Sequence, residues 1–209
     1  MENNVNILKH PLIEHKLAHL RNRESDNKLF RETLKELSYL MVYEITRDLK
    51  LKDVRVETPL RPCTCKHISE QVLLVPILRA GLGMVDGILN LIPTAKVGHI
   101  GLYRNEETLQ PKEYYFKIPP DAQDMRTFLL DPMLATGGSL SYAVKLLKGR
   151  GIRNITVVSI IAAPEGLETL QEDHPDIKIY SAMLDEKLND QGYILPGLGD
   201  CGDRIFGTV

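Results

Sequence analysis

The stretch TFLLDPMLATGGS (residues 127–139) decides the fold of this chain. An apolar run ends at Asp131 and leads through small residues into a helical pattern that stops before Gly151. Small residues and glycines let successive backbone N–H groups surround one point, and the following helix adds its positive N-terminal end. The pattern therefore predicts a strand, an anion-binding loop and a helix, with a phosphate monoester as the ligand.

Polar side chains in this stretch suit the same ligand. The hydroxyls of Thr136 and Ser139 are further donors to a phosphate, and Asp131 can accept hydrogen bonds from sugar hydroxyls. A valine at Gly137 is expected to fill the phosphate site while the fold survives. No Gly-Lys-Ser/Thr follows, so the loop is not a Walker A motif. An ordinary strand–turn–helix corner is the alternative, for which two glycines would suffice.

Short apolar runs alternate with helical patterns on both sides of this stretch. Expected strands are residues 72–78, 97–103, 127–130, 155–163 and 177–180. Expected helices are residues 82–91 and 139–150, and a third that begins at Pro164 and stops before Pro175. This alternation predicts an α/β fold with an open, mostly parallel sheet and flanking helices. In such sheets ligands bind beyond the carboxyl ends of the strands.

The first fifty residues read as helices that dock on this core. One helix begins at His10-Pro11, and Ser25 is the expected N-cap of the second. Residues 54–66 read as an irregular arm, because Pro59 and Pro62 interrupt any regular element.

Composition sets further bounds. The chain has 209 residues, 43% hydrophobic and 26% charged, as expected for one domain with a core. A net charge of −2 argues against a nucleic-acid surface. No apolar run is long enough for a membrane span. Cys63 and Cys65, with His67 nearby, do not have a common zinc spacing, so free thiols in the cytoplasm are the expectation.

Five segments, in order, carry a resemblance to a known family. They are HPLIEHKL (10–17), PILRAGLGM (76–84), GLYRNEET (101–108), DPMLATGGS (131–139) and YILPGLGDCGDRIFGT (193–208). The fourth resembles the 5-phosphoribosyl-1-diphosphate (PRPP) signature of type I phosphoribosyltransferases. Those enzymes usually carry two adjacent acidic residues, whereas Pro132 follows Asp131 here, as is typical of the uracil-specific branch. The whole chain resembles the uracil phosphoribosyltransferases.

The resemblance implies an activity and its site. The reaction would convert uracil and PRPP into UMP and diphosphate in pyrimidine salvage. Asp131, Asp200 and Arg79 would be the catalytic residues, and Ile194, Gly199, Asp200 and Cys201 would bind uracil. The implied PRPP contacts are Arg79, Arg104, Asp131, Pro132, Met133, Leu134, Ala135, Thr136, Gly137, Gly138, Ser139 and Asp200.

Two of these residues and one segment can also be interpreted without the resemblance, from the neighbouring sequence alone. Arg79 follows an apolar strand, and its guanidinium together with nearby backbone N–H groups is suited to binding a diphosphate. The alternative interpretation is a surface arginine at the end of a strand. Arg104 opens the charged residues 105–112, which read as a solvated hairpin loop; the resemblance implies a mobile loop that closes over PRPP. Residues 192–202 hold four glycines and a proline, which suits a hood whose backbone faces a flat ligand. Cys201 stands where relatives commonly have alanine.

The resulting domain division is residues 1–50 as N-terminal helices, 54–66 as the arm, 70–182 as the PRPP-binding core and 185–209 as the uracil-binding hood. Mg²⁺ is expected on the diphosphate of PRPP, without a dedicated protein metal site. The expected partners are uracil, PRPP and further copies of the chain, with no nucleic acid and no membrane; GTP is a candidate effector.

Other functions stay open on sequence alone. A purine or orotate enzyme of this fold, an RNA-binding regulator of the same fold and a catalytically silent relative are the alternatives. The group that deprotonates uracil is undetermined.

Overall fold

The computed structural model describes residues 4–104 and 111–208, with the side chain of Arg104 excepted. A central sheet has the strand order β1-β11-β10-β8-β4-β6-β7, and the short strands β5 and β9 pair with β4 and β10. Every pairing in this sheet is parallel except that of β6 with β7. The predicted fold class is confirmed.

The strands of this sheet are short and mostly apolar. They are β1 (Val5–Ile7), β4 (Val72–Leu78), β5 (Lys96–Val97), β6 (His99–Arg104), β7 (Pro111–Lys117), β8 (Arg126–Leu130), β9 (Met133–Leu134), β10 (Ile155–Ala162) and β11 (Lys178–Leu184). β4, β8 and β10 are buried along nearly their whole length, because helices cover both faces of the sheet.

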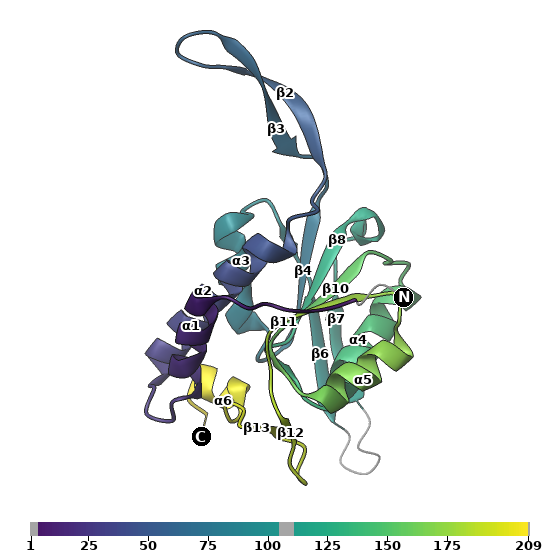
Figure 1. Ribbon diagram of the computed structural model, residues 1–209. Coiled ribbons are helices and arrows are strands. Elements are labelled where there is room, and N and C mark those ends of the chain that lie inside the picture. The colour runs from purple at the N-terminus through teal and green to yellow at the C-terminus, as the bar shows by residue number, and fades with distance from the viewer. Residues whose placement is uncertain (1–3, 105–110, 209) are drawn as a thin grey trace.

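Helices form two layers around the sheet. They are α1 (Pro11–Arg21), α2 (Asn27–Ile45), α3 (Leu82–Leu91), the short 3₁₀ turn η1 (Ala122–Asp124), α4 (Gly138–Gly149), α5 (Pro164–Asp173) and α6 (Cys201–Phe206). In Figure 1, α1, α2, α3 and α6 lie on one side of the sheet, and α4 and α5 lie on the other. Alternate residues of β4 divide accordingly: Val72 and Leu74 pack with α2 and α3, and Leu73 and Val75 pack with α4. None of these helices is both long and apolar enough to cross a membrane.

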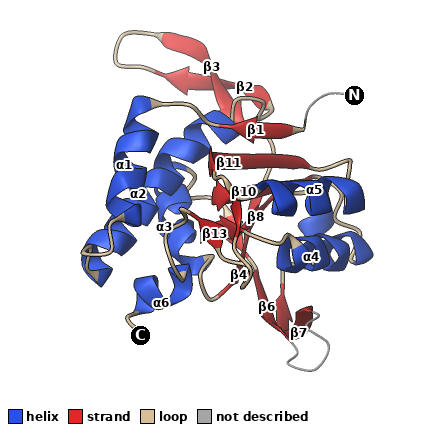
Figure 2. Cartoon of the chain, turned by 60° about the horizontal axis from the view of Figure 1, so that its bottom comes forward, coloured by secondary structure: helices blue, strands red, loops and turns tan. Residues whose placement is uncertain are grey.

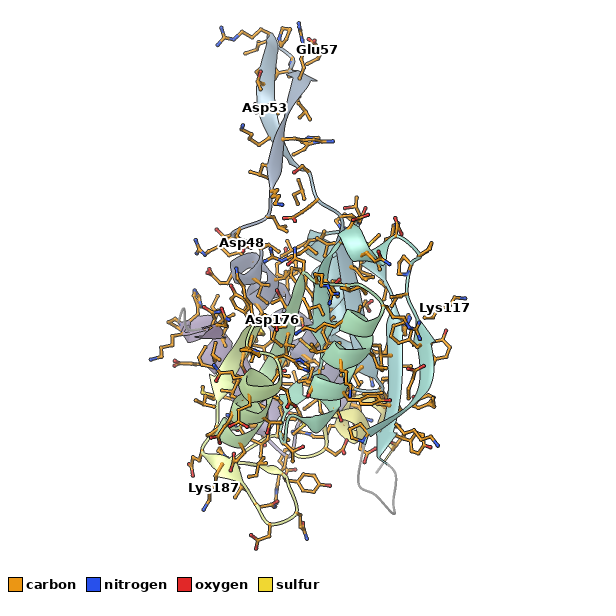
Figure 3. All side chains as sticks on the ribbon, turned by 90° about the vertical axis from the view of Figure 1, so that its right-hand side faces the viewer. Asp48, Asp53, Glu57, Lys117, Asp176 and Lys187 are labelled. Carbon is orange, nitrogen blue, oxygen red and sulfur yellow. The ribbon has the colours of Figure 1, made fainter. Side chains whose placement is uncertain are left out.

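The segment predicted as an irregular arm is a regular antiparallel hairpin. β2 (Leu51–Glu57) pairs with β3 (Pro62–Ile68) without interruption. Pro59 lies in the turn and Pro62 is the first residue of a strand, two places where proline interrupts no ladder. The hairpin projects from the core, as Figure 3 shows for Asp53 and Glu57. The prediction of irregular backbone was wrong because it weighed the prolines without their positions.

The N-terminal prediction needs two smaller corrections. The N-cap of α2 is Asp26, whose side chain accepts from the Leu29 N–H at 2.7 Å, and the Ser25 hydroxyl instead donates to the His19 carbonyl. The segment also contains a strand, β1, which pairs with β11 along the edge of the sheet. The helix expected at 82–91 and the helix expected to begin at Pro164 and stop before Pro175 are confirmed, as is Gly151 beyond the end of α4, where its φ is +86°.

Two short strands, β12 (Lys187–Leu188) and β13 (Ile194–Leu195), pair with each other and precede α6. Figure 1 shows both strands at the bottom of the molecule, with the β2–β3 hairpin at the opposite end, and Figure 2 shows β13 between α3 and α4. The C-terminal segment is thus placed next to the carboxyl ends of the parallel strands.

Candidate functional site

A cavity of about 310 Å³ opens at the carboxyl ends of β4, β6 and β8. Parallel strands all end at this edge, so the segments that follow them meet there. The lining residues come from the ends of β4 and β6, from the start of β7 and from the loop before α4: Ile77, Leu78, Arg79, Ala80, Leu102, Tyr103, Pro111, Asp131, Thr136, Gly138 and Ser139. Five residues of the predicted PRPP set line this one cavity.

The loop after β8 is held by the core at its start. The carbonyl of Pro132 accepts from the N–H groups of Ile160 and Ile161, both at 3.0 Å. Met133 and Leu134 form β9 against β10, and the Leu134 side chain is fully buried. These three predicted PRPP contacts therefore fix the loop in place, and the side chain of Leu134 is turned into the core.

The second half of the loop faces the cavity. Thr136 and Ser139 are exposed, and Gly137 is the N-cap of α4 with no side chain to satisfy the first helical N–H groups. The first backbone bond that enters α4 from the loop runs from the Ser141 N–H to the Gly137 carbonyl, at 2.8 Å. The N–H groups that precede Ser141 at this helix start are thus available to an anion.

The two glycines of this loop have different roles. Gly137 has a φ of +83°, and a Cβ there would lie 2.8 Å from the Gly166 carbonyl oxygen and 3.0 Å from the Cβ of Thr169, both on α5. A Cβ on Gly138 would meet nothing closer than Pro111 and Thr136, each at 3.9 Å, on the cavity side. The expectation that a valine at 137 enters the phosphate site with the fold intact was wrong, because that side chain would strike α5.

Asp131 lies at the floor of the cavity, directly after β8. Its N–H donates to the Val158 carbonyl at 3.2 Å, and its Oδ1 accepts from the Met133 N–H at 3.3 Å. Burial of the carboxyl raises the pKa of Asp131 to about 7, although the hydrogen bond from Met133 acts in the opposite direction. A carboxyl with this pKa can both accept and donate near neutral pH.

Arg79 follows β4 at the rim of the cavity and contacts α6. Its Nη2 lies 3.1 Å from Asp203 Oδ1, and its guanidinium carbon lies 5.8 Å from the centre of the Phe206 ring. The side chain is 55% exposed. The structure therefore places Arg79 between the cavity and the C-terminal helix.

The C-terminal segment is anchored by charged residues that were not predicted from the sequence. Arg21 donates to Asp185 at 2.9 Å and to the Gly197 carbonyl at 2.7 Å, and the Gly197 N–H donates to Asp185 at 3.0 Å. Arg204 donates to the Leu198 carbonyl at 2.8 Å. Residues 21 and 185 are too distant in sequence for any local pattern to indicate this pairing.

The four predicted uracil residues lie on this anchored segment. Ile194 is buried in β13, Gly199 has a φ of +79°, and Asp200 caps α6 by accepting from the Asp203 N–H at 2.9 Å. Cys201 is 2% exposed. Burial, and then the nearby carboxylates of Asp131 and Asp200, raise the pKa of the Cys201 thiol. The structure thus brings the hood and the floor of the cavity together at Cys201.

Arg104 ends β6 opposite Pro111 of β7, which confirms a hairpin at this place. Its side chain and residues 105–110 of the mobile loop predicted at 105–112 lie outside the described residues, whereas Pro111 and Lys112 belong to β7 and not to a loop. Ala80, Leu102, Tyr103 and Pro111 line the cavity and were missed as site residues, because apolar residues at strand ends look like ordinary core positions.

Two further features bear on ligands. In the part of the chain that the structure describes, no group of three or more His, Cys, Asp or Glu side chains is arranged to hold a metal ion. A larger cavity of about 530 Å³ lies where the edge strand β1 leads into α1, against α2, and is mostly apolar. It lacks the anion-binding loop and the arginine, so the smaller cavity is the candidate active site.

Comparisons with known proteins show the family to which this chain belongs. The model of the uracil phosphoribosyltransferase family matches residues 7–208. A uracil phosphoribosyltransferase of Bacillus cereus (strain B4264) is 58% identical over 203 residues, which cover 97% of each chain. A solved protein of Aquifex aeolicus is 42% identical, with a TM-score of 0.90 and 97% of each chain covered. A hypoxanthine-guanine phosphoribosyltransferase of Bacillus anthracis is 12% identical with a TM-score of 0.52, over 76% of this chain and 80% of that one, and shares the fold alone. This chain belongs to the uracil phosphoribosyltransferase family and is an enzyme of the phosphoribosyltransferase class.

Proposed function

We propose that this enzyme joins N1 of uracil to C1 of the ribose of PRPP, giving UMP and diphosphate, in the cavity at the strand ends. The observation that most supports this assignment is that an anion-binding loop, an arginine and the carboxyl group of Asp131 line one cavity, and that the glycine-rich hood lies next to the arginine. A 5-phosphate, a diphosphate, a base and sugar hydroxyls each have a partner of suitable chemistry there.

The loop before α4 is assigned the 5-phosphate. Backbone N–H groups of Gly138 and Ser139 and the hydroxyls of Thr136 and Ser139 are donors of the kind that phosphate oxygens need. Ala135 and Gly137 are assigned no donor side chain and form the backbone of the turn that carries these donors. Asp131 is assigned the ribose hydroxyls, since it lies between this loop and the hood.

The diphosphate is assigned to Arg79, with Arg104 as a second contact. Breaking the bond at C1 builds oxocarbenium character on the ribose, as in glycoside hydrolysis, and charge moves onto the departing diphosphate. A guanidinium fixed at the cavity rim stabilises that charge where it develops. Asp200, and Asp131 in its ionised form, would place negative charge near the sugar, which favours the cationic carbon. The group that takes the N1 proton stays unassigned.

Mg²⁺ fits the carboxylates at and beside this cavity. The oxygens of Asp131 in the cavity and of Asp200 in the neighbouring hood are hard ligands, and Mg²⁺ binds proteins through one or two carboxylates plus substrate phosphates. When bound, the ion neutralises charge on the diphosphate. Mg²⁺ would be held by the diphosphate of PRPP, and Asp131 and Asp200 would contribute at most indirectly.

Uracil is assigned to the backbone of Ile194 and residues 199–201. Its O2 and O4 need donors and its N3–H needs an acceptor, and main-chain groups supply that pattern without a recognition side chain. Cytosine has an amino group at position 4 and an unprotonated N3, so two contacts are mismatched. A panel of uracil, cytosine, orotate and purines separates this assignment from another enzyme of the same fold.

A test of the whole assignment is UMP formation from uracil and PRPP, with Mg²⁺ and after chelation. Product that depends on Mg²⁺ supports the proposal, and no product above background at saturating PRPP contradicts it. Salt-dependent RNA binding without turnover would instead favour the alternative function, an RNA-binding regulator of the same fold. A GTP effector stays a prediction, which addition of GTP to the same assay tests.

Assembly into a homodimer or a larger oligomer is part of the proposal. The apolar cavity beside α1 and α2 contains the exposed Tyr39 and Tyr43, and the projecting hairpin adds surface that one copy does not cover. Light scattering at micromolar concentration should give at least twice the mass of one chain. The three cysteines are free, which agrees with a cytoplasmic location.

A further inference from the structure

We infer that Asp203 is a positioning residue, which holds the guanidinium of Arg79 at the cavity rim for the diphosphate. This inference rests on the proposed function, because it assigns Asp203 a role through Arg79 in the same reaction. Asp203 lines no part of the cavity and carries no proposed substrate contact.

The contacts between the two residues are specific. Asp203 Oδ1 lies 3.1 Å from Arg79 Nη2 and also accepts a short hydrogen bond from the Thr208 hydroxyl. Arg79 Nη1 lies 3.5 Å from the same hydroxyl oxygen, and its guanidinium lies over the Phe206 ring. Three residues of the C-terminal segment therefore surround one side of the guanidinium.

Asp203 itself is held by the fold. It lies in the first turn of α6, and its N–H donates to Asp200 Oδ1 at 2.9 Å. The Thr208 hydroxyl and, after it, Arg79 hold the pKa of its carboxyl below the ordinary range, which favours the charged form further. The aspartate is thus a fixed anion that an otherwise flexible arginine can be oriented against.

This contact orients Arg79 and leaves it free to bind. A guanidinium carries five N–H donors in a rigid plane, and Asp203 and Thr208 lie near only its two Nη atoms. The remaining donors stay available on the cavity side. Orientation lowers the cost of fixing the long side chain when charge develops on the leaving group.

The test is a double-mutant cycle that combines Asp203→Asn with Arg79→Ala. Asparagine keeps an oxygen acceptor and the size of the side chain while it removes the charge. In the wild-type background kcat should fall about two- to fivefold, the range for a half-exposed ion pair, with the KM for uracil unchanged. In the Arg79→Ala background the same substitution should change kcat by less than about 1.5-fold.

One control variant and one replacement variant accompany this test. Glu168→Gln removes a carboxylate from the exposed face of α5 and should leave kcat unchanged. Thr208→Val loosens the Asp203 carboxyl without changing α6, and replaces the first variant if that one does not fold. An equal loss from Asp203→Asn in both backgrounds, or tighter PRPP binding, would overturn the inference.

A readout without turnover separates this inference from the proposed function. Calorimetry of diphosphate binding should show weaker binding in Asp203→Asn and no further weakening when Arg79 is already alanine. If the wild-type protein makes no UMP, the proposed reaction fails, and the calorimetric cycle still decides whether Asp203 positions Arg79.

Discussion

A valine at Gly138 should abolish PRPP binding and leave the fold intact. The structure places the Cβ of residue 138 on the cavity side of the loop, with 3.9 Å to its nearest neighbours, Pro111 and Thr136. The backbone there is not in the left-handed region, and valine in a helix is no worse than glycine, so the free energy of unfolding should change by less than about 1 kcal/mol.

The loss of affinity follows from the donors that the side chain would cover. Valine adds its methyl groups where the N–H groups at the start of α4 face the anion. A hydrogen bond to a charged group contributes about 1.5–3 kcal/mol, so the loss of two costs about 3–6 kcal/mol. PRPP affinity should then fall by about 10²–10⁴, using 1.4 kcal/mol per tenfold. Calorimetric titration with PRPP and urea unfolding of the same sample measure both quantities.

The matched control is Gly137→Val, one residue earlier. Its φ of +83° and the 2.8 Å approach to the Gly166 carbonyl oxygen should destabilise the fold. A left-handed non-glycine residue costs about 1–3 kcal/mol and overpacking costs about 1–3 kcal/mol more. Near-normal PRPP affinity in Gly138→Val would show that the phosphate lies elsewhere, and a fully stable Gly137→Val would show that the direction of that side chain is wrong.

Three further predictions test other parts of the site. Arg79→Ala should lower kcat by about 10²–10³, or about 2.7–4 kcal/mol, and a change of less than a few-fold in steady-state kinetics would remove its role. Burial raises the pKa of Asp131 to about 7, so the folded state holds that proton more tightly than the unfolded state, where the pKa is about 3.9. The free energy of unfolding should therefore fall, through this group, as pH rises from about 4 to about 7, and Asp131→Asn should flatten that part of the profile measured in urea. Cys201→Ala should keep kcat/KM for uracil within a few-fold and still exclude cytosine by about 10²–10⁴, since two mismatched contacts cost about 1–3 kcal/mol each; efficient cytosine use, or collapse of activity in the variant, would contradict backbone recognition.

Much of the fold follows from local patterns in the sequence. The strand expected at 72–78 and the helix expected at 82–91 match β4 and α3 residue for residue, because a buried apolar run and a helical apolar stripe are strong signals. Pro164 at the start of α5 and Gly151 after α4 mark helix ends through their own backbone geometry. These features need no knowledge of distant residues.

The errors occurred where position outweighs residue type. Pro59 and Pro62 stop a strand only inside a ladder, and here they occupy a turn and a strand start, so the hairpin β2–β3 forms. Ser25 and Asp26 are both good caps, and Asp26 is the one used, while the Ser25 hydroxyl donates to the carbonyl of His19 instead. Whether the side chain at Gly137 or at Gly138 enters the cavity depends on α5, which lies beyond the loop in sequence.

The sequence by itself determined the alternating strands and helices, the anion-binding loop and the residue types of the site, because each depends on residues that are contiguous in the chain. Only the tertiary structure decided how these segments meet. The ion pair of Arg21 with Asp185 anchors the hood, and the contact of Arg79 with Asp203 joins residues that are far apart along the chain. Such pairings form because parallel strands end at one edge of the sheet and bring the segments after them together, which no local pattern of residues specifies.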